Sequence, residues 1–314
     1  MRARYDLSMS RERAFIDLLK PLAGHPAARG LSDDAAVLEV GGSAVVLTHD
    51  MLVEGVHFLK GDPPQDIAWK LVAVNLSDLA AKGARPIGVL LGYALGDAQE
   101  DTDFVAGLRD ALKTYDVPLL GGDTVRMPDG APRAFGLTAI GEAGSGGVPS
   151  RAGARPGDHL YITGRIGLAG LGLAIAQGKA TGPDAWLQAY RRPQPRLAEG
   201  QALAPLVHAM ADISDGLLID AARMAEASAV AITIDLATVP VAGGVDRAGQ
   251  LAAVTAGDDY ELLFAAPPGL ILPASTVPIS AIGRVAHGHG LSLVNGDEAL
   301  PLPDRLGYQH DERR

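Results

Sequence analysis

Six short segments of the chain place aspartate directly beside a strongly apolar run. They are "LSDDAAV" at 31–37, "VVLTHDMLVEGVHF" at 45–58, "NLSDLAA" at 75–81, "LLGGDTVR" at 119–126, "DISDGLLID" at 212–220 and "AGDDYELLF" at 256–264. Burying that many carboxylates without partners would cost more free energy than a fold can gain elsewhere. The chain must therefore fold so that these segments either reach water or gather around cations.

The composition limits what kind of protein this is. The chain has 314 residues, enough for one large or two ordinary domains, and 47% are hydrophobic. A net charge of −10 argues against general affinity for nucleic acid, whose phosphates attract Lys and Arg. The absence of cysteine excludes disulfides, thiolate metal sites and thiol nucleophiles, and fits a cytoplasmic protein. No signal peptide or membrane-spanning stretch is expected.

The apolar periodicity predicts an α/β protein of the α+β type. Helices are expected from a Ser10 cap to Lys20, over 64–82, over 101–115 with Asp101 as cap, and near 167–178, 196–208 and 215–228. Strands are expected as a hairpin over 35–49 and at 86–95, 117–122, 133–143, 159–164, 210–213, 229–235, 259–266 and 277–285. The Gly- and Pro-rich stretch 144–157 is the best linker. We therefore expect two domains, 1–145 and 146–314, each with a mixed sheet.

Several polar side chains should share faces of these elements. Thr48 and Asp50 alternate with His49 along a strand, so they point the same way and His49 points opposite. Asn75 and Asp78 are three apart on a helix and share a face. Carboxylate and hydroxyl oxygens without cysteine favour Mg²⁺, Ca²⁺ or Mn²⁺. Several such ions in one cleft typically serve phosphates, which predicts phosphoryl transfer.

Two further segments fit phosphate chemistry without an ordinary P-loop, whose G-x-x-x-x-G-K-[ST] pattern does not occur. Asp123 follows two glycines, which let the backbone approach a ligand closely. Asp212, Ser214 and Asp215 lie where a strand becomes a helix, whose N-terminus should offer free N–H groups. For any single Asp, a cap or turn is the commoner role, and a lone His such as His57 is more often packed or exposed.

Seven motifs in order give the chain a family resemblance. "SDDAAV", "THDMLVEGVHF", "WKLVAVNLSDLAAKGARP", "GGDTVR", "SRAGARPGD", "DISDGL" and "GDDYELLF" together resemble the thiamine-monophosphate kinases. That family belongs to an ATP-binding superfamily with aminoimidazole ribonucleotide synthetase, selenophosphate synthetase and a hydrogenase-maturation dehydratase. The resemblance covers essentially the whole chain. It implies ATP-dependent conversion of thiamine monophosphate to thiamine diphosphate, several Mg²⁺ ions, and a homodimer formed through strands of the N-terminal domain.

The resemblance also implies roles for individual residues. The metal ligands would be Asp34, Thr48, His49, Asp50, Asp78, Asp123, Asp212 and Asp215. ATP would contact Gly122, Asp123, Arg151 and Ser214, and thiamine monophosphate would contact His57, Asp258 and Tyr308. No side chain is expected to act as nucleophile or general base, because the acceptor phosphate is largely ionised at neutral pH. The γ-phosphoryl group should therefore pass directly and in line.

Three positions depart from the family pattern. His49 stands where Thr is usual and could ligate through its carbonyl, Asp258 replaces Glu, and Ser32 replaces Gly. Two other functions compete with the kinase. One is an aminoimidazole ribonucleotide synthetase-like cyclase, which also consumes ATP. The other is a non-catalytic protein that binds nucleotide or thiamine phosphate. Neither membrane nor nucleic acid is an expected partner.

Overall fold

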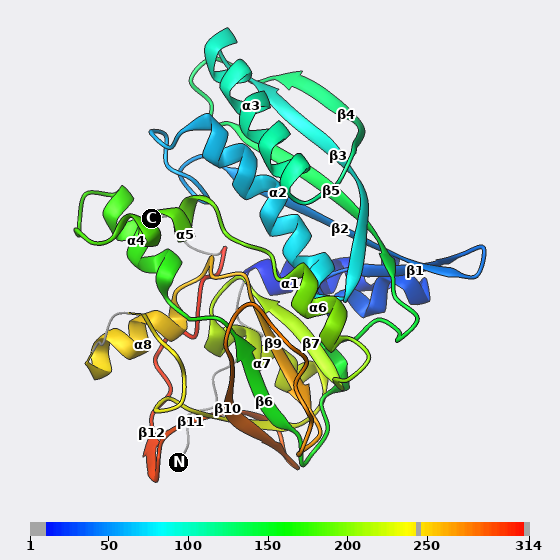
Figure 1. Ribbon diagram of the computed structural model, residues 1–314, viewed down its shortest axis with the longest axis vertical. Helices are drawn as coiled ribbons and strands as arrows, with labels where there is room; N and C mark the ends of the chain where they lie inside the picture. The colour runs from blue at the N-terminus through cyan, green and yellow to red at the C-terminus, as the bar shows by residue number, and fades with distance from the viewer. Residues whose placement is uncertain (1–10, 243–245, 311–314) are drawn as a thin grey trace.

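The computed structural model describes residues 11–242 and 246–310. Two β-sheets dominate it, one built from the N-terminal part of the chain and one from the C-terminal part (Figure 1). Each sheet has its own hydrophobic core. The expected helix cap Ser10 lies outside the described residues. The predicted mixture of hairpins and helical crossovers, with mixed sheets, is confirmed.

The N-terminal sheet has the strand order β1-β2-β5-β3-β4. Its strands are β1 Ala36–Val40, β2 Ser43–Val53, β3 Ala84–Leu95, β4 Leu119–Arg126 and β5 Ala134–Ala143. The predicted hairpin forms between β1 and β2, and Gly41 and Gly42 adopt the positive φ values that its tight turn requires. β3 and β4 pair in parallel, and the other neighbours are antiparallel. β4 is thus left at an edge.

Helix α2 is the element that joins the two sheets. α2 (Pro64–Ala81) and α3 (Ala98–Thr114) cover one face of the N-terminal sheet (Figure 1). Every residue of α2 from Asp66 to Ala81 is buried, because the helix also packs on the C-terminal strands β7 and β9. Ala80 and Ala81 share a small core with Met210 and Phe264 of those strands. A helix that is apolar nearly all round fits this central position.

The C-terminal sheet has the order β12-β11-β8-β10-β6-β9-β7. Its strands are β6 His159–Thr163, β7 Ala209–Ile213, β8 Ala231–Asp235, β9 Glu261–Ala266, β10 Ile279–Ala286, β11 Gly290–Asn295 and β12 Glu298–Leu300. The remaining helices are α1 Arg11–Leu19, α4 Leu168–Ala176, α5 Asp184–Arg191, α6 Leu197–Leu203, α7 Leu217–Ala227 and α8 Arg247–Thr255, with 3-10 turns η2 Lys20–Leu22, η3 Pro26–Leu31 and η4 Arg151–Gly153. α7 contributes most of its apolar residues to the core of this sheet.

The structure corrects several sequence predictions. Asp101 does not cap α3, which begins three residues earlier, and Asp97 accepts the capping hydrogen bonds from Gln99 and Glu100. Asp101 instead accepts a hydrogen bond from the Tyr93 hydroxyl. The helix expected over 196–208 ends at Leu203. The prediction missed α5, α8, β11 and β12 altogether.

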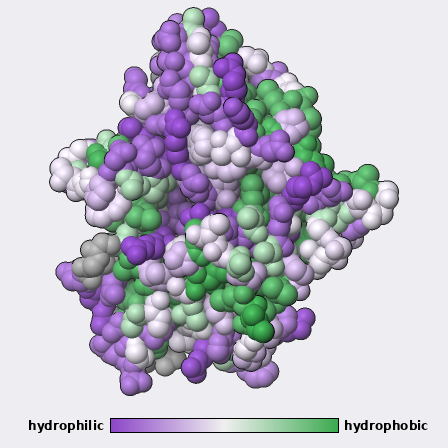
Figure 2. All heavy atoms as spheres, viewed as in Figure 1, coloured by the Kyte–Doolittle hydropathy of each residue, from purple (hydrophilic) through white to green (hydrophobic). Residues whose placement is uncertain are grey.

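The edge strand β4 is exposed along its whole length. Leu119, Leu120 and Val125 are about half exposed on it, and Leu90 and Leu95 are exposed on the neighbouring β3. Figure 2 shows hydrophobic atoms gathered on this side of the molecule. An exposed edge with apolar side chains is unusual for a monomer and marks a surface that another chain could cover. No helix in the described part of the chain is long and apolar enough to cross a membrane.

Candidate active site

A cleft of ≈ 540 Å³ lies where the two sheets face each other. Its volume falls in the range of small-molecule sites. The acidic side chains that line it are Glu12, Asp33, Asp34, Asp50, Asp78, Asp212, Asp215 and Glu226, and the basic ones are Arg13, Lys20, Arg151 and Arg223. Five of the predicted metal ligands and the predicted ATP contacts Arg151 and Ser214 therefore meet in one place.

Strand β2 presents its side chains to the cleft as the alternation predicted. Thr48 is buried and donates a short hydrogen bond to Asp78 on α2. The backbone N–H of Asp50 donates to Asn75 Oδ1 at 2.9 Å, so both predicted helix residues face β2. The ring of His49 lies on the opposite face, where Nδ1 contacts Thr138 Oγ1 at 2.9 Å. The His49 side chain therefore points away from the cleft, and only its backbone could contact a ligand there.

The carboxylates of the cleft repel one another. Burial raises the pKa of Asp50 to about 6, and the charges of Asp215 and Asp34 act in the same direction. Burial also raises the pKa of Asp78 well above its usual value, with Asp50 and Asp212 adding to the effect. The pKa of Asp212 is raised by burial and by Asp34. Each ionised group is thus held in a place that favours its neutral form unless positive charge is supplied.

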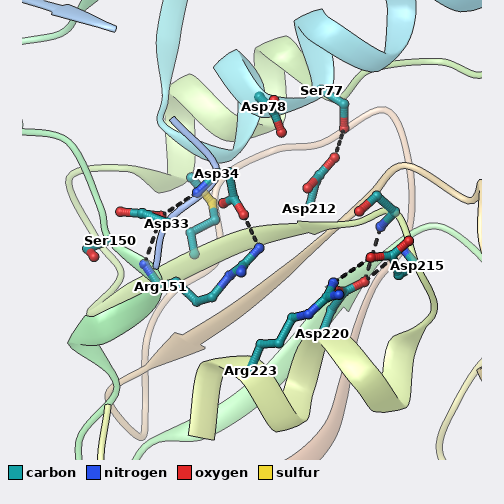
Figure 3. A network of polar contacts seen from close by, with 12 residues as sticks. Asp33, Asp34, Ser77, Asp78, Ser150, Arg151, Asp212, Asp215, Asp220 and Arg223 are labelled. Carbon is teal, nitrogen blue, oxygen red and sulfur yellow. Dashed lines mark hydrogen bonds and ion pairs between the residues drawn. The ribbon is translucent and has the colours of Figure 1, made fainter. Parts of the chain in front are cut away.

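The adjacent residues Asp33 and Asp34 have different environments (Figure 3). Asp33 contacts Lys82 Nζ at 2.5 Å and Arg29 Nη1 at 2.6 Å. Burial alone would raise the pKa of Asp33, but these two cations outweigh it and hold the pKa well below its usual value. Asp34 accepts a short hydrogen bond from Arg151, while its Oδ2 lacks a hydrogen bond although Lys82 Nζ lies 2.8 Å away. Asp33 is therefore structural, whereas Asp34 Oδ2 is held by an ion pair alone, without a hydrogen bond.

The N–H groups at the start of α7 are not free, which corrects the sequence prediction. Asp220, fully buried, accepts from the N–H groups of Ser214, Asp215 and Gly216 at 3.2, 3.1 and 3.3 Å. Arg223 bridges Asp215 and Asp220, at 2.6 and 2.9 Å. An anion cannot use those N–H groups while Asp220 fills them. The sequence analysis missed Asp220 and Arg223, although an Asp four residues after Gly216 is a usable capping signal.

The donor set fits a hard cation. Within residues 11–242 and 246–310, no three acidic or histidine side chains stand arranged to hold a metal ion. The carboxylates of Asp34, Asp50, Asp78 and Asp212 nevertheless line one cleft, they supply oxygen donors alone, and Asp34 Oδ2 has no hydrogen bond. Oxygen-rich, strongly anionic sites of this kind suit Mg²⁺.

The predicted substrate residues lie together outside that acidic lining. The buried ammonium of Lys70 donates to the carbonyl of His57 at 2.9 Å and to Asp258 Oδ2 at 2.8 Å. The rings of His57 and Tyr308 both pack against His310, with centroids 5.4 and 5.0 Å apart. Burial lowers the pKa of His57 to about 4, so its ring is neutral at pH 7. Lys70 and His310 complete this group and were not foreseen.

The segment 258–261, which holds the predicted substrate residue Asp258, has an unusual backbone. Asp258 and Tyr260 have positive φ values of 72° and 52°, which L-residues seldom adopt. Successive side chains consequently reach different partners: Asp259 accepts from the N–H of Gly167 at 2.8 Å and Glu261 binds Arg196. Tyr260 donates to Asp258 Oδ1 at 3.1 Å. Several anchors therefore fix the position of Asp258.

Gly122 and Asp123 do not join the cleft within one chain. Both lie on the exposed edge strand β4. The cross-strand register runs from Asp50 through β5 and β3 to Gly122, three strand spacings or roughly 14 Å across the sheet. Strand pairing itself requires glycine at 122, because a Cβ there would lie 1.9 Å from the Leu91 carbonyl oxygen. Asp123 is adjacent on the same strand.

Comparison with known proteins gives consistent results over the whole chain. Residues 32–143 match the family described as AIR synthase related protein, N-terminal domain, and residues 155–294 match its C-terminal domain. A thiamine-monophosphate kinase of Caulobacter vibrioides is 38% identical, covering 93% of this chain and 88% of the relative. That of Escherichia coli K12 is 36% identical, covering 90% and 91%. The structure described as AaThiL complexed with AMPPCP and TMP has a TM-score of 0.84 at 27% identity, covering 98% and 99%.

Proposed function

The chain belongs to the thiamine-monophosphate kinase family, and on that premise we propose that it transfers the γ-phosphoryl group of ATP directly to thiamine monophosphate. The observation that carries the proposal is the cleft that brings together Asp50, Asp78 and Asp212, whose carboxyl groups all have raised pKa values. Such a site needs added positive charge, and the metal ions that bind together with ATP would supply it. A structural relative that holds AMPPCP and TMP supports the same pair of ligands.

Mg²⁺ ions would be held by the carboxylates of Asp34, Asp50, Asp78 and Asp212, with Thr48 and the backbone of His49 beside them. When bound, the ions would offset the repulsion between two phosphates brought into line. The protein itself holds these groups on β2, α2, β7 and the segment before β1 before any ligand arrives, so little reorganisation is needed. Arg151 already contacts Asp34 and would turn to an ATP phosphate when cations take its place.

The acceptor explains why no side chain needs to act as nucleophile or base. A phosphate monoester has its second pKa near ~6 and is mostly dianionic at neutral pH. No base is needed to remove a proton from it. The site therefore has to align the two phosphates and compensate their negative charges. His57, neutral at pH 7, and the ring of Tyr308 would face the aminopyrimidine and thiazolium of the substrate. Asp258 would supply a carboxylate whose position Lys70 fixes.

A homodimer through the N-terminal strands is part of the proposal. The apolar edge around Leu119, Leu120 and Val125 is available for such an interface. Pairing two copies there would place Gly122 and Asp123 at the subunit junction, which accounts for a ligand-binding motif on a strand remote from the cleft of its own chain. The division into an ATP- and metal-binding domain, 1–145, and a domain that completes the site, 146–314, belongs to the same proposal, as does a cytoplasmic location.

The direct experiment is to incubate the purified protein with ATP, Mg²⁺ and thiamine monophosphate and to resolve the products. We expect thiamine diphosphate and ADP in equal amounts, and no reaction without Mg²⁺. ADP with inorganic phosphate and no thiamine diphosphate would contradict the proposal. Closure of an imidazole ring from a formylglycinamidine ribonucleotide would instead identify the cyclase alternative.

A further inference from the structure

Three guanidinium groups line the cleft. Arg13 contacts Glu226, and the other two lie against predicted metal ligands and are held differently. Arg151 contacts Asp34, whereas Arg223 on α7 contacts Asp215 and Asp220 (Figure 3). Asp34 and Asp215 are both predicted metal ligands, so each guanidinium occupies a place where a metal ion could otherwise bind. A metal ion can bind there only if the guanidinium moves away.

Arg223 is fixed. Its partner Asp220 is fully buried, and the other carboxylate oxygen of Asp220 already accepts three backbone N–H groups. Moving Arg223 away would leave the buried Asp220 without the cation that is hydrogen-bonded to it, which is strongly unfavourable. The two residues are also three apart on one helix, so the pair forms within α7 and needs no other element to position it.

Arg151 is movable by comparison. Its Nε is buried and has no hydrogen-bond partner, and Asp34 Oδ2 also lacks a hydrogen bond. If Arg151 leaves, Asp34 is still compensated by Lys82 Nζ, 2.8 Å away and fully buried. Departure therefore strands no buried charge, and it gives Arg151 the chance to satisfy its guanidinium on a phosphate.

We propose that Arg223 is a built-in cation that takes the place of a metal ion at Asp215, so that the ions of this cleft are confined to the group Asp34, Asp50, Asp78 and Asp212. The inference rests on the proposed function for the presence of ions. It assigns Arg223 an electrostatic role in the cleft, because its positive charge is permanent, whereas the ions that would compensate Asp50, Asp78 and Asp212 arrive with ATP. The site would accordingly need fewer ions than its carboxylates suggest.

Counting bound Mn²⁺ by electron paramagnetic resonance, with AMPPCP present, tests the inference. Asp215→Asn should bind as many ions per chain as the wild type, because Arg223 already occupies that position. Arg223→Met should bind one more ion, and the double variant Arg223→Met/Asp215→Asn should return to the wild-type number. Arg223→Lys, which keeps the charge, is the control and should not gain an ion.

One ion fewer in Asp215→Asn would overturn the inference, since a metal would then share Asp215 with Arg223. An unchanged count in a folded Arg223→Met would overturn it equally. If Arg223→Met does not fold, the Asp215→Asn count decides alone. Wild-type turnover of thiamine monophosphate is measured separately, so a protein that makes thiamine diphosphate while Asp215→Asn loses an ion contradicts this inference and leaves the proposed function standing.

Discussion

Ser77 on α2 donates a hydrogen bond of 2.7 Å to Asp212 Oδ2 on β7, and this contact joins the helix that covers the N-terminal sheet to the C-terminal sheet (Figure 3). The next residue, Asp78, accepts from Thr48 on β2. Two consecutive residues of the buried helix α2 therefore contact different sheets. Ser77 binds the carboxylate of Asp212 in the C-terminal sheet, and Asp78 directs its own carboxylate to Thr48 in the N-terminal sheet. The relative placement of Asp78 and Asp212 is therefore set by α2.

Removing one cleft charge should abolish turnover without harming the fold. Asp50→Asn keeps the size of the side chain but removes a carboxylate whose charge interacts with those of Asp34 and Asp215. We expect turnover at saturating Mg²⁺ to fall by about 10²-fold or more, as for other losses of transition-state charge stabilisation. Without Mg²⁺ the melting temperature should stay the same or rise, because like-charge repulsion is relieved.

The matched control is Asp129→Asn in the exposed loop after β4, which should change neither turnover nor the melting temperature. Near-wild-type turnover of Asp50→Asn would show that the cleft carboxylates do not carry the reaction.

We expect Asp258 to bind thiamine monophosphate and Lys70 to hold the Asp258 carboxylate in position. Asp258→Asn removes the carboxylate and leaves the buried ammonium of Lys70 without its anion. We expect the KM for thiamine monophosphate to rise about ten- to a hundredfold relative to that for ATP, for the loss of a charge-assisted hydrogen bond. The melting temperature should fall as well. The double variant Lys70→Met/Asp258→Asn should recover the melting temperature but not the KM. If both KM values instead change in parallel, Asp258 is a structural residue.

The carboxyl group of Asp259 should make the protein less stable at higher pH. Burial raises its pKa to about 8, against 3.8 as the ordinary value, although Gly167 and Ala169 donate to it. The folded state therefore holds a proton that the unfolded state has lost, and the free energy of unfolding decreases as pH rises from about 4 to about 8. Asp259→Asn keeps an acceptor for Gly167 and should flatten this dependence. Denaturant unfolding at pH 6 and pH 8.5 measures it, and an equal slope in both proteins would refute it.

The edge strand β4 should be a subunit interface. Leu120 is 56% exposed on it, and Leu120→Asp should convert a dimer to a monomer in sedimentation velocity and reduce turnover. Ile271→Asp is the control, since Ile271 is 88% exposed on the C-terminal part of the chain. A monomeric wild type at working concentration, or a dimeric Leu120→Asp variant, would contradict the interface.

Local patterns in the sequence predicted what local patterns can determine. The alternation of Thr48, His49 and Asp50 and the helix 64–82 needed only the period of a strand and of a helix. The helix α5, "DAWLQAYR", was hidden by prolines and glycines on both sides, and the short strands β11 and β12 lie at a sheet edge with few buried residues. Weak burial leaves little periodicity to detect.

Partners distant in sequence could not be predicted in this way. Lys70 and Asp258 are 188 residues apart, and no spacing rule connects them. Lys82 carries a usable hint, because a lysine within the apolar segment "LAAKGARP" must find an anion if it is buried. The position of Asp123 could not be predicted from its motif. Its motif resembles the others, but the fold places it on an exposed strand, outside the cleft of its own chain.

The most direct test of the central claim uses ATP whose γ-phosphorus is made chiral with oxygen isotopes and thiamine monophosphate as acceptor. A single in-line displacement by an already ionised phosphate gives thiamine diphosphate whose terminal phosphorus has inverted configuration. We expect inversion, with one thiamine diphosphate formed for each ATP consumed. Retention of configuration, or transfer of the label to the protein when thiamine monophosphate is withheld, would contradict direct transfer between the two ligands.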